Sequence, residues 1–209
     1  MIKPEETISK LKEKLTPLIG ERFGFDKVNT FPVEYVLRCG YCAETVTCGE
    51  AIKIIHFFEN YWMYMKITFN PYEKVVKKGV IETFFNVMFT LSIFHGGFSD
   101  KKKHLFRAEW DNYEKDESSH PQPHWHFYMN DEEIDSESFE SSIKNTKSGF
   151  AESLETDKKE FQKIHFAMNA QWNETNKSHM HKIDNADTFI EWTFGLIDHI
   201  RVQLEYIDN

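Results

Sequence analysis

The sequence has no long uninterrupted run of apolar residues. Its first 15 residues carry a charge at every second or third position, which excludes the apolar stretch of a secretory signal peptide. The longest apolar segment, residues 80–94, is interrupted by polar side chains and is too short to cross a bilayer. We therefore expect a cytoplasmic protein with no membrane partner.

Cysteine is scarce, and the three cysteines lie close together at Cys39, Cys42 and Cys48. Stable disulfides are not expected in a reducing compartment. Cys39 and Cys42 have the spacing of a zinc half-site or a redox dithiol, but the sequence offers no second cysteine pair to complete a zinc site. We interpret all three as ordinary residues of half-buried strands, with metal or redox chemistry as the alternative.

Basic residues are sparse in the second half of the chain. Residues 1–104 carry 15 Lys and Arg against 12 Asp and Glu, whereas residues 105–209 carry 10 against 22. Sequence-independent adhesion to nucleic acid needs many Lys and Arg to neutralise phosphates, so the acidic half argues against it. Two groups of lysines, in residues 74–78 and 101–103, are interpreted as solvated surface.

Aromatic side chains are abundant, with 19 Phe, 8 Tyr and 5 Trp, and they suffice to build one sizeable core. We expect residues 1–209 to form a single α+β domain whose largely antiparallel sheet has about six or seven strands covered by three main helices. The helices are predicted at residues 4–20, at 75–94, and from about residue 185 to the C-terminus. An acidic, Ser-rich segment around residues 130–159 is expected to be a mobile loop.

Strands are predicted where β-branched and aromatic residues dominate. A hairpin is expected around Glu59 and Asn60, although its turn lacks the usual glycine. Asn70 followed by Pro71 predicts the start of the second helix. The predicted strands are residues 31–40, 41–49, 51–58, 61–69, 104–110, 124–129 and 161–172.

The most informative stretch is HPQPHWHFY, residues 120–128, in which histidines occupy alternate positions. Alternate side chains of a strand point to the same face, so one face could carry three imidazoles. That arrangement is costly in a core and natural in a metal site. If the strand at residues 104–110 pairs with this one, Glu109 stands beside the histidine face.

We therefore predict a site for a divalent metal ion, Zn, Mn or Mg. Such an ion lowers the pKa of its bound water and polarises a scissile bond. Arg107 would steady an anionic substrate, and His165 or Asp111 would act as general base. The predicted metal ligands are His120, His124, His126 and Glu109.

The segment PHWHF, residues 123–127, resembles the His-hydrophobic-His strand motif of the HUH endonucleases, which nick single-stranded DNA. The resemblance covers about five residues. It implies a metal held by the two histidines of this segment with Glu109 or His120, and attack on the phosphodiester by Tyr206. The tyrosine-bearing motif of that family is not otherwise matched.

The leading hypothesis is a metal-dependent hydrolase that acts on a phosphodiester or related bond, with nucleic acid or another phosphorylated molecule as substrate. The alternative is a non-enzymatic subunit of a larger cytoplasmic assembly. In that case the histidines are structural side chains satisfied by hydrogen bonds, and the aromatic surfaces and acidic loop bind protein partners.

Overall fold

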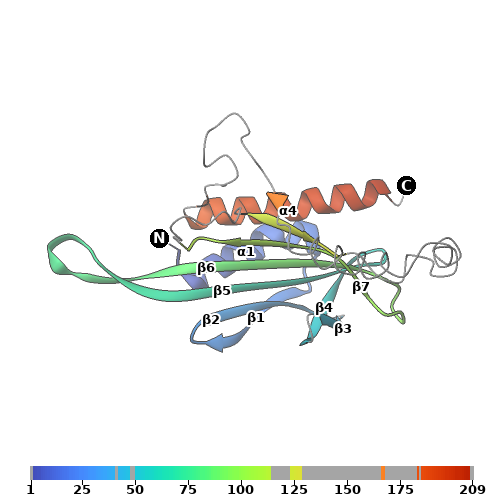
Figure 1. The fold of residues 1–209 in the computed structure, drawn as a ribbon, viewed down its shortest axis with the longest axis horizontal. Coiled ribbons are helices and arrows are strands. Elements are labelled where there is room, and N and C mark those ends of the chain that lie inside the picture. The colour runs from blue at the N-terminus through green and yellow to red at the C-terminus, as the bar shows by residue number, and fades with distance from the viewer. Residues whose placement is uncertain are drawn as a thin grey trace, which may run out of the picture.

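The computed structural model describes residues 2–40, 42–47, 50–113, 123–128, 166–167, 183 and 185–207. These residues form one large antiparallel sheet of nine strands, with two helices packed against one of its faces (Figure 1). The α+β class and the largely antiparallel sheet are confirmed. The predicted strand 161–172 is described only at Phe166–Ala167, and the predicted loop at 130–159 lies outside the described residues.

The helices are α1 (Pro4–Ile19) and α4 (Ala186–Ile207), and the short 3₁₀ turn η1 spans Lys77–Gly79. The strands are β1 (Phe23–Thr30), β2 (Val33–Cys39), β3 (Cys42–Thr47), β4 (Glu50–Phe58), β5 (Tyr61–Val75), β6 (Ile81–His95), β7 (Lys103–Asp111), β8 (His124–Phe127) and β9 (Phe166–Ala167).

The sheet order is β1-β2-β5-β6-β7-β8-β9, and β4 pairs with both β3 and β5. The outer edge of β5 is shared, because β4 pairs with its start and β2 pairs with it over residues 66–69. The expected hairpin at Glu59 and Asn60 joins β4 to β5. Glu59 has φ +44°, so it adopts the left-handed conformation that a glycine would adopt without strain.

Helix α1 begins and ends, and α4 begins, where the sequence predicts. Pro4 is the first residue of α1, and the N–H of Gly20 closes its last turn by donating to the carbonyl of Thr16 at 2.9 Å. At the start of α4, the side-chain oxygen of Asn185 accepts the backbone N–H of Thr188 at 2.9 Å. Among the described residues no helix is long and apolar enough to cross a membrane.

The core lies between the helices and the sheet face formed by the odd-numbered residues of β5 and β6. Phe89 is 1% exposed, and its ring lies 5.8 Å from Phe189 and 5.2 Å from Trp192 of α4. Leu11 and Leu15 of α1 are fully buried in the same cluster. The buried sheet residues are Met63, Met65, Ile67, Phe69, Val87, Phe89, Leu91 and Ile93.

The helix predicted at residues 75–94 is wrong, because this segment contains the end of β5, the turn η1 and most of strand β6. The 15 residues of β6 pair in continuous register with β5, and Pro71, taken as a helix start, lies inside β5 opposite Phe85. Apolar and polar side chains alternate from Phe89 to Ile93 with the period of a strand. Proline is tolerated because no described strand pairs with the outer edge of β5 beyond Phe69. The structure therefore has two main helices in its described part instead of three.

The sheet is also larger than the six or seven strands predicted. Strand β1 was not predicted, since its sequence FGFDKVNT is largely polar and becomes a strand only by pairing with β2 along the sheet edge. The expectation that residues 101–103 are solvated is wrong for Lys102, which is 7% exposed. Its ammonium donates to the carbonyls of Phe98 at 3.2 Å and Asp100 at 2.8 Å, and also to Gly97.

Replacing Phe89 by alanine should lower the free energy of unfolding by about 3–5 kcal/mol, because the ring fills the contact between β6 and α4. Urea denaturation followed by circular dichroism measures this change. The matched control is Tyr206→Ala on α4, where the side chain is 82% exposed and the expected change is within about 0.5 kcal/mol. Equal effects of the two substitutions would contradict this description of the core.

Candidate metal centre

The site lies where β7 and β8 run side by side as antiparallel neighbours. Glu109 pairs with His124 across the two strands, and Arg107 pairs with His126. Cross-strand partners project to the same side of a sheet, so these four side chains share one face. This is the juxtaposition of Glu109 with the histidine face that we expected from the sequence.

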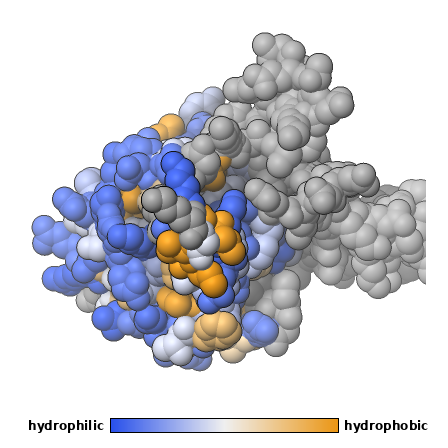
Figure 2. Space-filling view, turned by 90° about the vertical axis from the view of Figure 1, so that its left-hand side faces the viewer, coloured by the Kyte–Doolittle hydropathy of each residue, from blue (hydrophilic) through white to orange (hydrophobic). Residues whose placement is uncertain are grey.

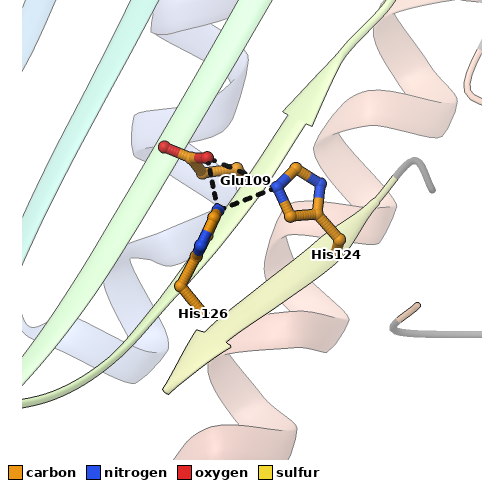
Figure 3. A group of neighbouring side chains, drawn as sticks. All are labelled: Glu109, His124 and His126. Carbon is orange, nitrogen blue, oxygen red and sulfur yellow. Dashed lines mark hydrogen bonds and ion pairs between the residues drawn. The ribbon is translucent and has the colours of Figure 1, made fainter. Parts of the chain in front are cut away.

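The site occupies the sheet face opposite the helices. On β7 the neighbours of Glu109 are Ala108 and Trp110, which are buried in the core beneath α4. Side chains alternate along a strand, so Glu109 must point the other way. Figure 3 shows Glu109, His124 and His126 converging on the near side of the strands, with the helices behind the sheet.

Three potential ligand atoms meet at this point. Nε2 of His126 lies 2.9 Å from Oε2 of Glu109, and Nε2 of His124 lies 3.4 Å from the same oxygen. The two Nε2 atoms are themselves 2.9 Å apart. The group formed by Glu109, His124 and His126 could hold a metal ion, and we refer to it as the triad.

The spacing of the triad atoms is compatible with one shared ion, since they lie 2.9–3.4 Å apart. Nε2 of His124, Nε2 of His126 and Oε2 of Glu109 would hold the ion, which would supply Lewis-acid chemistry and activate a bound water. Binding would release the protons that the imidazole nitrogens otherwise share with each other and with the carboxylate.

The electrostatics of the triad keep Glu109 ionised. Burial by itself raises the pKa of Glu109, but the hydrogen bonds from His124 and His126 and the positive charge of Arg107 outweigh it, and the pKa is held well below its usual range. Nε of Arg107 lies 3.0 Å from Oε1 of Glu109, while Oε2 faces the histidines. The ion pair thus orients the carboxylate as an outer-shell partner orients a ligand.

The triad is shielded from water. His124 is 1% exposed and His126 is 8% exposed, whereas the Glu109 side chain is 28% exposed. An unligated polar group at this depth is costly unless it is hydrogen-bonded or bound to an ion. The arrangement therefore fits either an internally hydrogen-bonded cluster or a metal site.

Polar side chains continue from the triad across the same sheet face. Thr90 and Ser92 of β6 pair with Glu109 and Arg107, and Lys66 of β5 pairs with Thr90. Sequence reasoning missed this row because β6 was taken as a helix. The alternation of Thr90 and Ser92 with Phe89, Leu91 and Ile93 is the signal that would have found it.

The other predicted site residues are placed differently. Asp111 shares the triad face at the end of β7, where Oδ1 accepts the backbone N–H of Tyr113 at 3.1 Å. The structure does not bring Asp111 into the triad. His120 and His165 lie outside the described residues. Tyr206, the nucleophile implied by the resemblance to the HUH endonucleases, lies on α4, the helix that covers the opposite face of the sheet.

The cysteines and His104 are also separate from the triad. Cys39 and Cys42 carry free thiols on β2 and β3, and Cys48 lies outside the described residues. The His104 ring stacks between Phe94 at 4.4 Å and Tyr128 at 3.8 Å. Burial, aided by the charge of Arg107, lowers the pKa of His104 to about 4.

Together these features describe an α+β protein with two histidines and a carboxylate gathered on the sheet face opposite α1 and α4. No family model matches the chain, and neither a curated protein nor a solved structure matches it.

Acid should weaken the fold through His104. Its folded pKa of about 4 lies below the ordinary 6.5, so the native state disfavours the charged form. The stability associated with neutral His104 is fully present above pH 6.5 and is lost as the pH falls towards 4, by up to about 3 kcal/mol. His104→Phe retains an aromatic ring between Phe94 and Tyr128 but cannot titrate, so its unfolding free energy should fall less over this range. Parallel curves of unfolding free energy against pH for the two proteins would contradict the assignment.

Proposed function

We propose that the chain binds a divalent transition-metal ion through the triad and uses it to hydrolyse an anionic ester of the phosphoester class. The observation that supports the proposal is the convergence of three ligand atoms, none more than 3.4 Å from another, on one side of the sheet. The ligands come from two paired strands of a packed sheet, so their geometry is held by the core and does not depend on a loop.

The ligand set favours a borderline ion. Two imidazole nitrogens and one carboxylate oxygen suit Zn²⁺, Mn²⁺ or Fe²⁺, whereas Mg²⁺ prefers a shell of oxygen ligands. Of the three ions expected from the sequence, Zn and Mn therefore fit the triad better than Mg does.

The residues around the triad supply what hydrolysis of an anionic ester requires. A bound divalent ion would lower the pKa of its bound water and polarise the ester. Arg107 has five N–H donors, and its contact with Glu109 uses only Nε, so the same guanidinium could also bind a phosphate oxygen. Thr90 and Ser92 place hydroxyl groups beside Glu109 and Arg107.

The general base remains a prediction. Asp111 lies on the triad face two positions beyond Glu109 along β7, which is consistent with proton transfer to a substrate that spans this face. The role of His165 remains an expectation from the sequence.

A structural role for the cluster is the competing proposal. It is favoured by the burial of His124 and by the hydrogen bonds that join His126 to His124 and to Glu109 without an ion. A chain of this kind would serve a larger assembly as a non-enzymatic subunit. The two proposals differ in whether the protein binds metal.

Metal binding should depend on the triad. Isothermal titration of the chelator-treated chain with Zn²⁺ or Mn²⁺ should show about one ion per chain, and Glu109→Gln should raise the dissociation constant by roughly 100-fold or more. The double change His124→Ala with His126→Ala should abolish binding. His199→Ala, which removes an exposed histidine of α4, is the matched control and should bind as the wild type does. A native chain without metal that also takes up neither ion would sink the proposal and support the structural role.

Hydrolysis should depend on Arg107. With bis(p-nitrophenyl) phosphate as substrate, the metal-loaded Arg107→Gln variant should show a higher KM and a kcat/KM lower by roughly 10- to 100-fold, because one charge-assisted contact to the phosphate is lost. Its metal content should stay near that of the wild type. Arg38→Gln removes another ion-paired arginine on a strand and should leave the rate unchanged. The corresponding monoester, p-nitrophenyl phosphate, is a second substrate. If the metal-loaded wild type hydrolyses neither compound, the hydrolytic part of the proposal fails while metal binding stands.

A further inference from the structure

Strands β5 and β6 extend well beyond their neighbours in the sheet. Strand β2 pairs with β5 only as far as Phe69, and β7 pairs with β6 only from Met88 onward. In the described part of the chain, no strand pairs with the outer edges of residues 70–75 or 81–86. We call this two-stranded ribbon, residues 70–86, the arm. Figure 1 shows the arm projecting from one end of the sheet.

Aromatic contacts support the half of the arm nearest the sheet. Phe69 and Phe85 meet edge to face at 6.5 Å on one side of the ribbon, and Tyr72 stacks on Phe84 at 5.8 Å on the other. An isolated hairpin is only marginally stable in water, so these contacts and the continuity with the core are what hold the arm in shape. Beyond these contacts the pairing of β5 with β6 continues as far as Val75 and Ile81, next to the turn at the tip.

The tip of the arm combines aliphatic and basic side chains. Residues 74–81, KVVKKGVI, contain four aliphatic residues, three lysines and a glycine, with no acidic residue. Val75 is 66% exposed, Val80 is 53% exposed and Ile81 is 61% exposed. Figure 2 looks at this end of the molecule and shows a hydrophobic patch surrounded by hydrophilic surface. Gly79 has φ +76°, which lets the chain turn tightly between the two strands.

We propose that the tip of the arm docks on the surface of an anionic lipid bilayer. Val75, Val80 and Ile81 would enter the boundary between headgroups and acyl chains, while Lys74 and Lys77 lie at the level of the lipid phosphates. Exposed aliphatic side chains beside lysines are typical of interfacial membrane binding, in which buried apolar area and attraction to anionic lipid add together. This is attachment at a surface, and it differs from the sequence-based expectation that these lysines are merely solvated and that no membrane partner exists.

The composition of the tip favours lipid over the other classes of partner. Protein interfaces are enriched in aromatic residues and arginine and depleted in lysine, whereas the tip has only lysine and aliphatic residues. Nucleic-acid binding would use the lysines on phosphates but would leave the valines and Ile81 without a role. A convex hairpin tip can also enter a deformable lipid surface, whereas a protein partner would need a preformed groove to receive it.

The geometry of the arm separates its tip from the acidic charges of the sheet. About six residues of each strand extend beyond the sheet, which is roughly 20 Å at the rise of a β-strand. The Debye length at physiological ionic strength is about 8 Å. Acidic side chains at the base of the arm, such as Glu34 and Asp111, are therefore largely screened from a bilayer at the tip. Glu73 and Glu82 flank the tip on the arm itself, and Glu82 pairs with Lys74, so the three lysines of the tip exceed the neighbouring carboxylates by one charge.

The test is co-sedimentation of the full chain with vesicles. Wild type should bind vesicles of phosphatidylcholine with phosphatidylserine and should bind pure phosphatidylcholine at least tenfold more weakly. Val80→Asp with Ile81→Asp should lower the partition coefficient at least tenfold, and Lys77→Gln should lower it about fivefold. The matched controls are Val202→Asp, at 52% exposure on α4, and Lys12→Gln on the exposed side of α1, both of which should bind as wild type does.

Amide hydrogen exchange provides a second measurement that needs no variant. Anionic vesicles should slow exchange in residues 74–81 of the wild type and leave α1 and α4 unchanged. The proposal is overturned if the wild type does not bind anionic vesicles, or if the tip and control variants bind equally. It is also overturned if the tip substitutions abolish self-association or binding to single-stranded DNA in a chain that ignores vesicles.

Discussion

The structure depends on the pairing of β5 with β6, which runs through 15 residues of each strand in continuous register. Because side chains alternate, this pairing places one set of residues under the helices and the other on the opposite face of the sheet. Phe89 and Leu91 close the core against α4, while Thr90 and Ser92 stand next to Glu109 and Arg107. A slip of one residue between β6 and β7 would bring Glu109 beside an apolar row. The register of β5, β6 and β7 therefore determines both the core and the candidate site.

Burying the polar groups of the triad costs free energy, and the geometry of the site offsets part of that cost. A carboxylate and two imidazoles are gathered where His124 and His126 are almost excluded from water, although burial opposes the charged form of Glu109. Hydrogen bonds and Arg107 compensate for that burial. A divalent cation would offset the cost of this burial more strongly, because its two positive charges would lie next to all three ligand atoms. The same arrangement is held together by its own hydrogen bonds and could also hold an ion.

The sequence predicted the features that depend on neighbouring residues in the chain. Pro4 and Gly20 bound α1, Asn185 caps α4, and the alternate histidines with Glu109 on the preceding strand identified the triad before strand order was known. The predictions failed where local signals conflict with tertiary pairing. Asn70 and Pro71 resemble a helix start, yet 15 cross-strand pairs outweigh that signal, and the polar strand β1 is a strand only because β2 lies beside it. Histidines alternate in the sequence at residues 120–126, but only pairing shows which of them meets a carboxylate.

The two proposals also constrain each other, because β6 carries both the tip of the arm and the neighbours of the triad. Nine residues separate Ile81 from Thr90, the partner of Glu109, which corresponds to roughly 30 Å along the strand. A ribbon continuous with the core cannot fold back over that distance without breaking the β5–β6 pairing. A chain docked through its tip would therefore hold the triad well above the bilayer. Its phosphoester substrate would then be a molecule in solution or on a neighbouring protein, because the headgroups beneath the tip lie beyond the reach of Arg107 and the triad.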